Sequence, residues 1–498
     1  MVAVAEPAVT GAPQVTWKER LVVTLRNHRW FAAALAVGAL LRLVAMLGFG
    51  PAMWFNDSYD YVSVALHPRP HPIRPDGYAF WLLLLRPFHS FSFVVLTQHL
   101  MGLATAGLIY ALLVKRFAMA GWAATLATVP VLFDAYQIQL ETLIMSDAMF
   151  ILLVTGVITL VLWHRSMTWQ VGAAVGGLLA LTALTRSIGL PILALVVAFI
   201  LIKRVGWKPV VAMLAACAIP VVGYMGWFKA VNGPFAMTQS DGVILYMRTA
   251  LWADCDKMGL DPRADLDLAL LCINTPVTER KNSAQYYLWW DNENQLHVFG
   301  AGRKFDAETN RIASEFAKRA IMAQPLDYLG AVAKDFFRAF QWGRPTFPDP
   351  KTFLLYEFSN NTTTKLPQWS SYRGTTNGDA TRYENGEAAT VKVAPFSTFM
   401  MSYQSVIRLP GTILGLLVLV GLAGVVQRWR TLGGPVLLPW LGAVGLVLAP
   451  AATAEFDYRY LLPAVPLACL AAAITLRNAR LPRKRAQEEP LAAEPVAP

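Results

Sequence analysis

Asn56-Asp57-Ser58-Tyr59-Asp60-Tyr61 follows directly after the first long apolar run of the chain, 30–49. Two carboxylates lie three residues apart in this stretch, with aromatic side chains between and beside them. About 20 apolar residues in a helix cross the hydrocarbon core of a bilayer, so run 30–49 predicts a membrane span. The acidic pair is therefore expected where this span leaves the membrane. The next question is which other polar residues reach the same side.

The composition is typical of a membrane protein. The 498-residue chain is 55% hydrophobic and only 15% charged, with a mean hydropathy of +0.42. Soluble proteins average about 25% charged residues. The net charge of +11 comes mostly from Lys and Arg in short segments between apolar runs, which is the pattern of a positive-inside topology. These features argue against nucleic-acid binding.

About ten apolar runs approach the length of a span. They are 30–49, 92–114, 119–135, 142–163, 170–185, 187–202, 209–230, 408–426, 434–453 and 460–476. We therefore predict an all-α fold, a polytopic bundle of transmembrane helices with one mainly helical extracytoplasmic domain. Within that domain the helical patterns cover Ala307–Ala323 and Leu326–Phe340, the second preceded by a proline that suits a helix start.

The basic residues between the runs orient the bundle. Every second connection is basic, and these connections are expected in the cytoplasm together with both termini; they contain Lys115, Arg116, Arg165, Lys203, Arg204, Lys208, Arg428 and Arg430. The predicted divisions are a basic N-terminal segment 1–28, a first group of spans 29–230 with an external loop 50–91, an extracytoplasmic domain 231–407, final spans 408–477, and a tail 478–498. The location is the plasma membrane, with the active side outside.

Four cysteines are too few for a disulfide scaffold, and no CxxC pair indicates zinc. Cys217 and Cys469 lie in apolar runs and are expected to be inert. Cys255 and Cys272 lie together in the segment placed outside the cytoplasm, where an oxidising compartment favours a bridge. The alternative is two unrelated free thiols.

Four groups of polar residues are expected on the outer face. The first contains Asp57 and Asp60, followed by His67, Arg69, His71, Arg74 and Asp76; the others are Glu141 with Asp147, Arg186, and the stretch Glu455-Phe456-Asp457-Tyr458-Arg459-Tyr460. Single charges near a bilayer edge can be explained by snorkelling, but a one-sided set of carboxylates and arginines suits a general base with cations for a phosphate. Arg42, inside the first run, could snorkel or face the bundle interior and a substrate.

A metal enzyme finds no support in the spacing of the residues. Neither HxxxH nor HExxH occurs, so a zinc hydrolase is not indicated, and His89 and His99 are expected to pack or cap rather than bind metal. No cofactor is required by the residues. Whether a divalent metal takes part is left open.

The chain resembles the GT-C superfamily of glycosyltransferases, which use polyprenyl-phosphate sugars, and within it the protein mannosyltransferases and aminoarabinose transferases. Asn56–Tyr61 matches the acidic first external loop of this superfamily, and Arg74–Tyr78 is similar to its Pro-Pro-Gly-Tyr-Pro stretch, with Asp76 in place of a proline. Leu140–Phe150 resembles its Glu-x-x-x-(Met/Leu)-Ser-(Glu/Asp) segment. Leu184–Arg186 resembles its Leu-Thr-Arg-Pro turn, and Asp457–Pro463 its Arg-Tyr-x-x-Pro motif.

The resemblance covers roughly 30–230 and 408–477, and it implies an enzyme. The implied reaction moves a hexose or pentose, with inversion, from a polyprenyl-phosphate donor to a hydroxyl of an envelope glycan, lipid or protein in cell-wall biogenesis. The composition is typical of a high-GC bacterium. The polyprenyl tail is expected to lie between spans near Gly77–Phe88.

The resemblance also assigns roles to residues. Asp57 is the expected base and Asp60 the second choice; if one turn of helix places them side by side, like-charge coupling would raise one pKa. Arg186 and Arg459 are candidates for the donor phosphate, with Arg74 a third. The remaining predicted substrate-binding residues are Arg42, Tyr78, Glu141, Asp147 and Asp457.

Two other classes of protein remain as alternatives. A transporter or flippase of an envelope intermediate would also place charges among spans, but it favours internal repeats and broken helices at mid-membrane, and no repeat is evident. A non-catalytic assembly or sensory protein would bind a partner through the external domain. It would tolerate loss of Asp57, Arg186 and Arg459.

Overall fold

The computed structural model describes residues 26–479 except 165, 262, 291–294, 301 and 359–364. In this range the protein is mainly helical, as predicted, and its strands are short. β1 (Phe49–Gly50) pairs antiparallel with β4 (Val391–Lys392), and β2 (Ser370–Ser371) pairs antiparallel with β3 (Gly374–Thr375). Most of the predicted segments 1–28 and 478–498 lies outside the described residues.

The α-helices fall into two sets. Those before residue 233 are α2 (Arg29–Gly48), α3 (Asn56–Leu66), α4 (Gly77–Leu85), α5 (Phe91–Ala111), α6 (Gly121–Leu126), α7 (Val129–Phe133), α8 (Ala135–Thr142), α9 (Asp147–Trp163), α10 (Trp169–Thr185), α11 (Gly189–Ile202) and α12 (Trp207–Asn232). Those after it are α13 (Asp241–Thr249), α14 (Leu266–Ala269), α15 (Ala307–Ala323), α16 (Pro325–Arg338), α17 (Pro350–Leu354), α18 (Thr376–Glu384), α19 (Phe396–Val406), α20 (Gly411–Gln427), α21 (Leu437–Thr453) and α22 (Ala464–Ala479).

Short 3₁₀ and π turns connect or extend these helices. They are η1 (Arg86–Phe88), η2 (Leu112–Arg116), η3 (Cys255–Met258), η4 (Val277–Glu279), η5 (Tyr286–Trp290), η6 (Gln295–Phe299), η7 (Trp429–Thr431), η8 (Gly434–Val436) and η9 (Tyr458–Tyr460). The helices predicted over Ala307–Ala323 and Leu326–Phe340 are confirmed as α15 and α16, and Pro325 begins the second.

Five of the described helices are long and apolar enough to cross a membrane: Arg29–Gly48, Phe91–Arg116, Trp207–Asn232, Gly434–Thr453 and Tyr458–Arg477. The pair α19 and α20, bent by 55°, raises this number to six if it is one broken span. Three shorter apolar helices, α9, α10 and α11, accompany them. These helices indicate a multi-pass membrane protein. A total of about ten spans stays a prediction.

The run predicted as one span over 119–135 is divided. It forms α6 and α7, with a break at Ala127 and Thr128. Pro130 lies in the first turn of α7, where its missing N–H costs nothing but where it cannot continue a preceding helix. The run is therefore not one continuous helix, because Pro130 begins a new one, and its role as a span stays a prediction.

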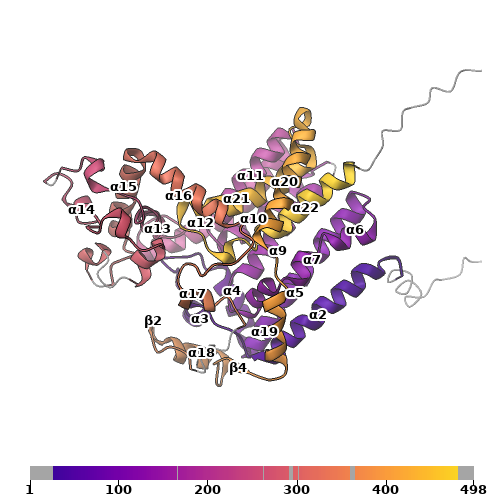
Figure 1. Cartoon of the computed structure of the whole chain (residues 1–498), viewed down its shortest axis with the longest axis horizontal. Helices are drawn as coiled ribbons and strands as arrows, with labels where there is room; N and C mark the ends of the chain where they lie inside the picture. Colours follow the sequence, from indigo (N-terminus) through magenta and orange to yellow (C-terminus); the bar gives the residue numbers. More distant parts are fainter. Residues whose placement is uncertain are drawn as a thin grey trace, which may run out of the picture.

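Glycines allow the closest helix contacts. A Cβ on Gly172 or Gly176 of α10 would clash with the backbone carbonyls of Pro209 and Met213 on α12. The two glycines are four residues apart, so they lie on one face of α10 and let the helices approach along a full turn. In Figure 1 the start of α2 and the end of α22 lie at one end of the bundle, opposite α3 and α4.

Residues 231–407 contribute to two hydrophobic cores. Buried side chains between Val243 and Ala320 form a small separate core from α13, α14 and α15. Buried side chains between Phe347 and Met400 belong instead to the large core of the membrane helices. Figure 1 shows α13 to α15 projecting to one side of the bundle, whereas α18 lies against α3 and α19 against α2.

The predicted Cys255–Cys272 disulfide is present and closes a segment of the small core. Both of its neighbouring turns, η3 and α14, pack against α15. The free cysteines, Cys217 and Cys469, are buried, as expected.

We expect the double substitution Cys255→Ser/Cys272→Ser to destabilise the small core by about 3 kcal/mol, since opening a loop of this size restores entropy to the unfolded chain. Limited proteolysis in detergent should then cut between 243 and 320 much faster than in the native protein. Equal cutting rates would contradict a structural role for the bridge. Cys217→Ser is the matched control, because that thiol is buried and unbridged.

Arg42 and Glu141 form a fully buried ion pair between α2 and α8. Arg42 Nε donates to Glu141 Oε2 at 2.7 Å and Nη2 donates to Oε1 at 2.9 Å. His99 Nδ1 lies 2.9 Å from Glu141 Oε2, and Gln137 Nε2 donates to Oε1 at 2.9 Å. Gly102 of α5 leaves room for this carboxylate, since a Cβ there would clash with it. The buried charges are therefore paired and hydrogen-bonded.

We expect Glu141→Gln to lower the free energy of unfolding by about 3–5 kcal/mol, because it leaves the Arg42 charge buried without a counter-ion. A large fall in melting temperature, measured on detergent-purified protein, checks this. Arg42→Met/Glu141→Gln should recover part of the loss, since the unpaired charge is gone. Glu315→Gln, which breaks an exposed pair with Arg311, should leave the melting temperature unchanged.

Candidate active site

The site is built around the first turn of α3. Phe55 N donates to Ser58 Oγ at 2.9 Å, which satisfies the amide that precedes the helix. Asp57 follows in the first turn, where a carboxylate is favoured by the helix dipole. Asp60 is one turn later on the same helix, so both carboxylates face the same neighbours. The side chain of Asp57 is 22% exposed and that of Asp60 is 41% exposed.

Two arginines hold Asp57 from opposite ends of the sequence. Arg74 Nη1 lies 3.1 Å from Asp57 Oδ1, and Arg459 Nη1 donates to Asp57 Oδ2 at 2.8 Å. Burial raises the pKa of Asp57, but the charges of the two arginines outweigh it and hold the pKa well below its usual range. The expected rise of one pKa by like-charge coupling is not found at Asp57. At neutral pH this group is a carboxylate.

Arg74 also bridges the two aspartates, since its Nη2 lies 3.4 Å from Asp60 Oδ2. His71 Nε2 approaches the same Asp60 oxygen at 3.7 Å. Burial lowers the pKa of His71 to about 4 despite the nearby carboxylates, so the imidazole is neutral at pH 7. Arg74 is thus the cation that balances Asp60 at neutral pH.

A second arginine pair borders this group. Arg186, directly after α10, pairs with Asp147 at the start of α9. Both guanidinium groups lie near the ring of Tyr460, with their central carbons 5.3 Å (Arg186) and 5.1 Å (Arg459) from its centre. The face of Phe55 covers Arg459 at 4.9 Å. Aromatic faces stabilise such partly desolvated cations.

The segment 455–459 positions Arg459 through contacts with two separate parts of the chain and through a bond of its own. Glu455 Oε2 accepts from Ser283 Oγ at 2.8 Å, and Asp457 Oδ2 accepts from the Tyr356 hydroxyl at 2.7 Å. Asp457 Oδ1 also accepts from the Arg459 amide at 3.1 Å, which closes the turn. Burial raises the pKa of Asp457. These bonds restrict where the Arg459 side chain can reach.

The predicted site residues do not all meet. Asp57, Asp60, Arg74 and Arg459 form one connected group, and Asp147, Arg186 and Asp457 border it. Arg42 and Glu141 face the bundle interior and bind each other instead. Tyr78 is fully buried with its hydroxyl on Gln98 Oε1 at 2.6 Å, although its ring packs edge-on at 4.9 Å against Tyr61.

Asp76, from the first predicted group, is also buried. Its Oδ2 accepts from the Tyr224 hydroxyl at 3.0 Å and from the His71 amide at 3.1 Å. Burial raises its pKa to about 7. The next residue, Gly77, has no room for a side chain, because a Cβ there would lie 2.6 Å from Leu184 O at the end of α10. This Asp-Gly pair therefore joins the segment between α3 and α4 to the turn that carries Arg186.

Sequence reasoning gave no role to Tyr356, Tyr61 and Ser146. Tyr356 orients Asp457, and the Tyr61 hydroxyl donates to Ser146 Oγ at 3.0 Å, next to Asp147. No spacing pattern identifies Tyr356, since it lies far from every motif. Among the described residues, no group of three or more His, Cys, Asp or Glu is placed to hold a metal ion.

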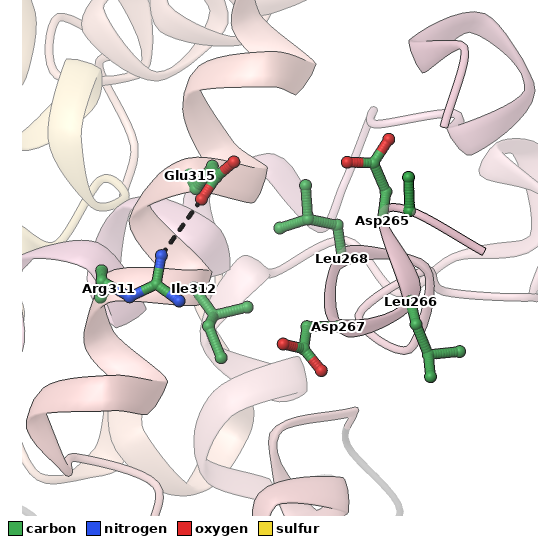
Figure 2. A pocket seen from close by; sticks show the side chains of 8 residues that line it. Asp265, Leu266, Asp267, Leu268, Arg311, Ile312 and Glu315 are labelled. Atoms are coloured by element: carbon green, nitrogen blue, oxygen red, sulfur yellow. Dashed lines mark hydrogen bonds and ion pairs between the residues drawn. The ribbon is translucent and has the colours of Figure 1, made fainter. Parts of the chain in front are cut away.

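A small hollow of about 240 Å³ opens between α14 and α15, away from these residues in the sequence. Figure 2 shows Arg311 paired with Glu315 on one wall and Asp265 and Asp267 on the other. It contains none of the predicted site residues. Its charges are paired at the surface, as in Arg319 with Asp265 at 2.9 Å.

The chain has only distant similarity to known proteins. It matches no protein-family model and no curated protein. One similar solved structure is the archaeal oligosaccharyltransferase AglB from Archaeoglobus fulgidus in complex with an inhibitory peptide and a dolichol-phosphate, at 13% identity and a TM-score of 0.37, covering 92% of this chain and 50% of that one. Another is the Archaeoglobus fulgidus oligosaccharyltransferase tethered to an acceptor peptide, at 11% identity and a TM-score of 0.36, covering 90% and 50%. The chain spans about half the length of both.

Proposed function

We propose that the protein is an integral membrane glycosyltransferase that moves a sugar from a polyprenyl-phosphate donor to an acceptor hydroxyl outside the cytoplasm. The observation that carries the proposal is the Asp57 carboxylate held between Arg74 and Arg459, with Arg186 beside them. A carboxylate with several adjacent arginines supplies a base and a binding site for a phosphate. The acceptor is a glycan, lipid or protein of the envelope.

Asp57 is the proposed base. Each of its oxygens accepts from one arginine and keeps a further lone pair for an acceptor hydroxyl. The acceptor oxygen attacks the anomeric carbon from the side opposite the phosphate, and its proton passes to Asp57. The bond between the anomeric carbon and the phosphate oxygen breaks, and its electron pair leaves with the polyprenyl phosphate, so the configuration inverts.

The low pKa of Asp57 limits when it can accept the proton. A strongly stabilised carboxylate is a poor base toward a neutral alcohol, but the alcohol becomes acidic as its oxygen bonds to the anomeric carbon. Proton transfer is therefore late and concerted with attack. In this account the arginines keep Asp57 ionised and oriented, which favours near-attack geometry.

Arg186 and Arg459 are the proposed phosphate ligands. Both guanidinium groups border Tyr460, and within the described residues Arg459 Nε lacks a hydrogen-bond acceptor although it is buried. Arginine can bind two phosphate oxygens at once, and it stays charged as negative charge develops on the leaving group. Asp147 pairs with the Arg186 side chain, and Asp457 Oδ2 lies 3.8 Å from Arg459 Nε.

We expect Asp57→Asn to lower sugar transfer at least about 100-fold, since the amide cannot take the acceptor proton. Transfer of a radiolabelled sugar from isolated donor lipid in proteoliposomes measures this. Asp60→Asn is the matched control on the same helix, and it should keep most of the activity. An inactive Asp60→Asn protein with an active Asp57→Asn protein would contradict the assignment, provided that both melt near the native temperature.

Arg186→Gln is expected to lower kcat/KM for the donor about 10- to 100-fold, which corresponds to the loss of one charge-assisted hydrogen bond. Arg186→Lys should retain part of the activity, because it keeps the charge and the pair with Asp147. The dependence of the rate on donor concentration gives kcat/KM for each of the two variants. If kcat/KM falls equally in the Arg186→Gln and Arg186→Lys proteins while both remain folded, positive charge at this position does not bind the donor.

A further inference from the structure

Helix α16 (Pro325–Arg338) exposes large apolar side chains on one side, and their exposure to water is unfavourable. The exposed fractions are 80% for Leu326, 57% for Leu329 and 66% for Phe337. At about 100° per residue, these three side chains project within an arc of about 80°. They form a continuous stripe along the helix, which we call the α16 stripe.

The buried residues of α16 are one apolar side chain, Val332, and one carboxylate, Asp335. Asp335 lies about half a turn from the α16 stripe. Its Oδ2 accepts from Arg248 Nη1 at 2.8 Å, and its Oδ1 accepts from Arg338 Nη1 at 3.0 Å. A helix at a water surface exposes mainly polar side chains, whereas α16 exposes three large apolar ones on one side. The exposed α16 stripe is therefore suited to an apolar environment.

The position of α16 identifies that environment. It packs against α21, and the residues after it meet the start of α20, where a Cβ on Gly411 would lie 2.6 Å from Gln341 O. Figure 1 shows α16 running across the direction of α21 and α22 instead of alongside them. Trp342 is exposed at the same end, as is typical of residues at a membrane interface.

The exposed apolar surface of α20 lies next to this end of α16. Leu416 and Leu419 are exposed on that helix, which belongs to the bent apolar pair. The side chain of Phe340 packs at 3.2 Å from the Cβ position of Gly415, one residue before Leu416. The exposed apolar surface of α20 thus lies next to the end of α16.

We propose that α16 lies flat in the outer leaflet, with the α16 stripe inserted among acyl chains below the headgroups. The lipid surface is the occupant, in place of a second copy of the chain or a protein partner. Asp335 Oδ2 also accepts from Phe456 N at 3.4 Å, within the segment that positions Arg459. Helix α16 therefore fixes the height of that segment relative to the headgroups.

Single cysteines labelled with an environment-sensitive fluorophore test the proposal. Leu326→Cys, Leu329→Cys and Phe337→Cys report on the α16 stripe. Arg311→Cys, at an exposed position on α15, gives the signal of a fluorophore in water. Asp327→Cys is the near control, about 100° around the same helix. The native free thiols are buried, and the unsubstituted protein supplies the blank. The full-length variants are reconstituted in vesicles of phosphatidylcholine and phosphatidylglycerol, with and without nitroxide on the acyl chains.

We expect blue-shifted emission at 326, 329 and 337, and quenching by the acyl-chain nitroxide at least threefold stronger than at 311, with 327 in between. Quenching at the α16 stripe equal to that at 311 would overturn the proposal. Blue-shifted emission that the lipid nitroxide does not quench would also overturn it, since this result indicates that a second copy or another protein covers the α16 stripe. The measurement needs no sugar transfer, so its failure is separate from failure of the proposed function.

Discussion

The salt bridges of Asp57 with Arg74 and Arg459 are the constraint on which the site depends. Asp57 and Arg459 are 402 residues apart, so their contact joins the segment after the first membrane helix to the start of the last one. Three further interactions keep this contact in place: the Asp457 turn, the Tyr356 hydroxyl and the aromatic cover of Phe55. A buried arginine with fixed neighbours loses little entropy when it binds a phosphate, and a carboxylate held by two cations stays ionised. The same contacts thus serve the fold and the proposed chemistry.

Much of the helical fold follows from hydropathy and local signals. The helices α15 and α16 were predicted within two residues at each end, because amphipathic spacing and Pro325 mark them. The break between α6 and α7 was missed, because apolar length alone does not register a proline. The pairing of Arg42 with Glu141 joins residues 99 positions apart, and composition alone does not reveal such long-range contacts.

The site could be predicted in part. Basic connections placed Asp57, Arg186 and the segment 455–459 on one side, and the structure brings their side chains together. Individual contacts could not be predicted, because they depend on how helices rotate against each other. Tyr356 comes from a region without any pattern, and its role depends on the buried Asp457. The sequence showed which residues carry charge, whereas packing decides which charges neutralise each other.

The central claim is that a polyprenyl-phosphate donor binds at Arg186 and Arg459 beside Asp57. Mass spectrometry of lipids that co-purify with the native protein and with the Asp57→Asn protein tests it most directly. The account predicts a polyprenyl-phosphate-linked sugar on the Asp57→Asn protein and mainly the sugar-free polyprenyl phosphate on the native protein. Ordinary phospholipids alone on both proteins, after purification from cells that contain the donor, would contradict it.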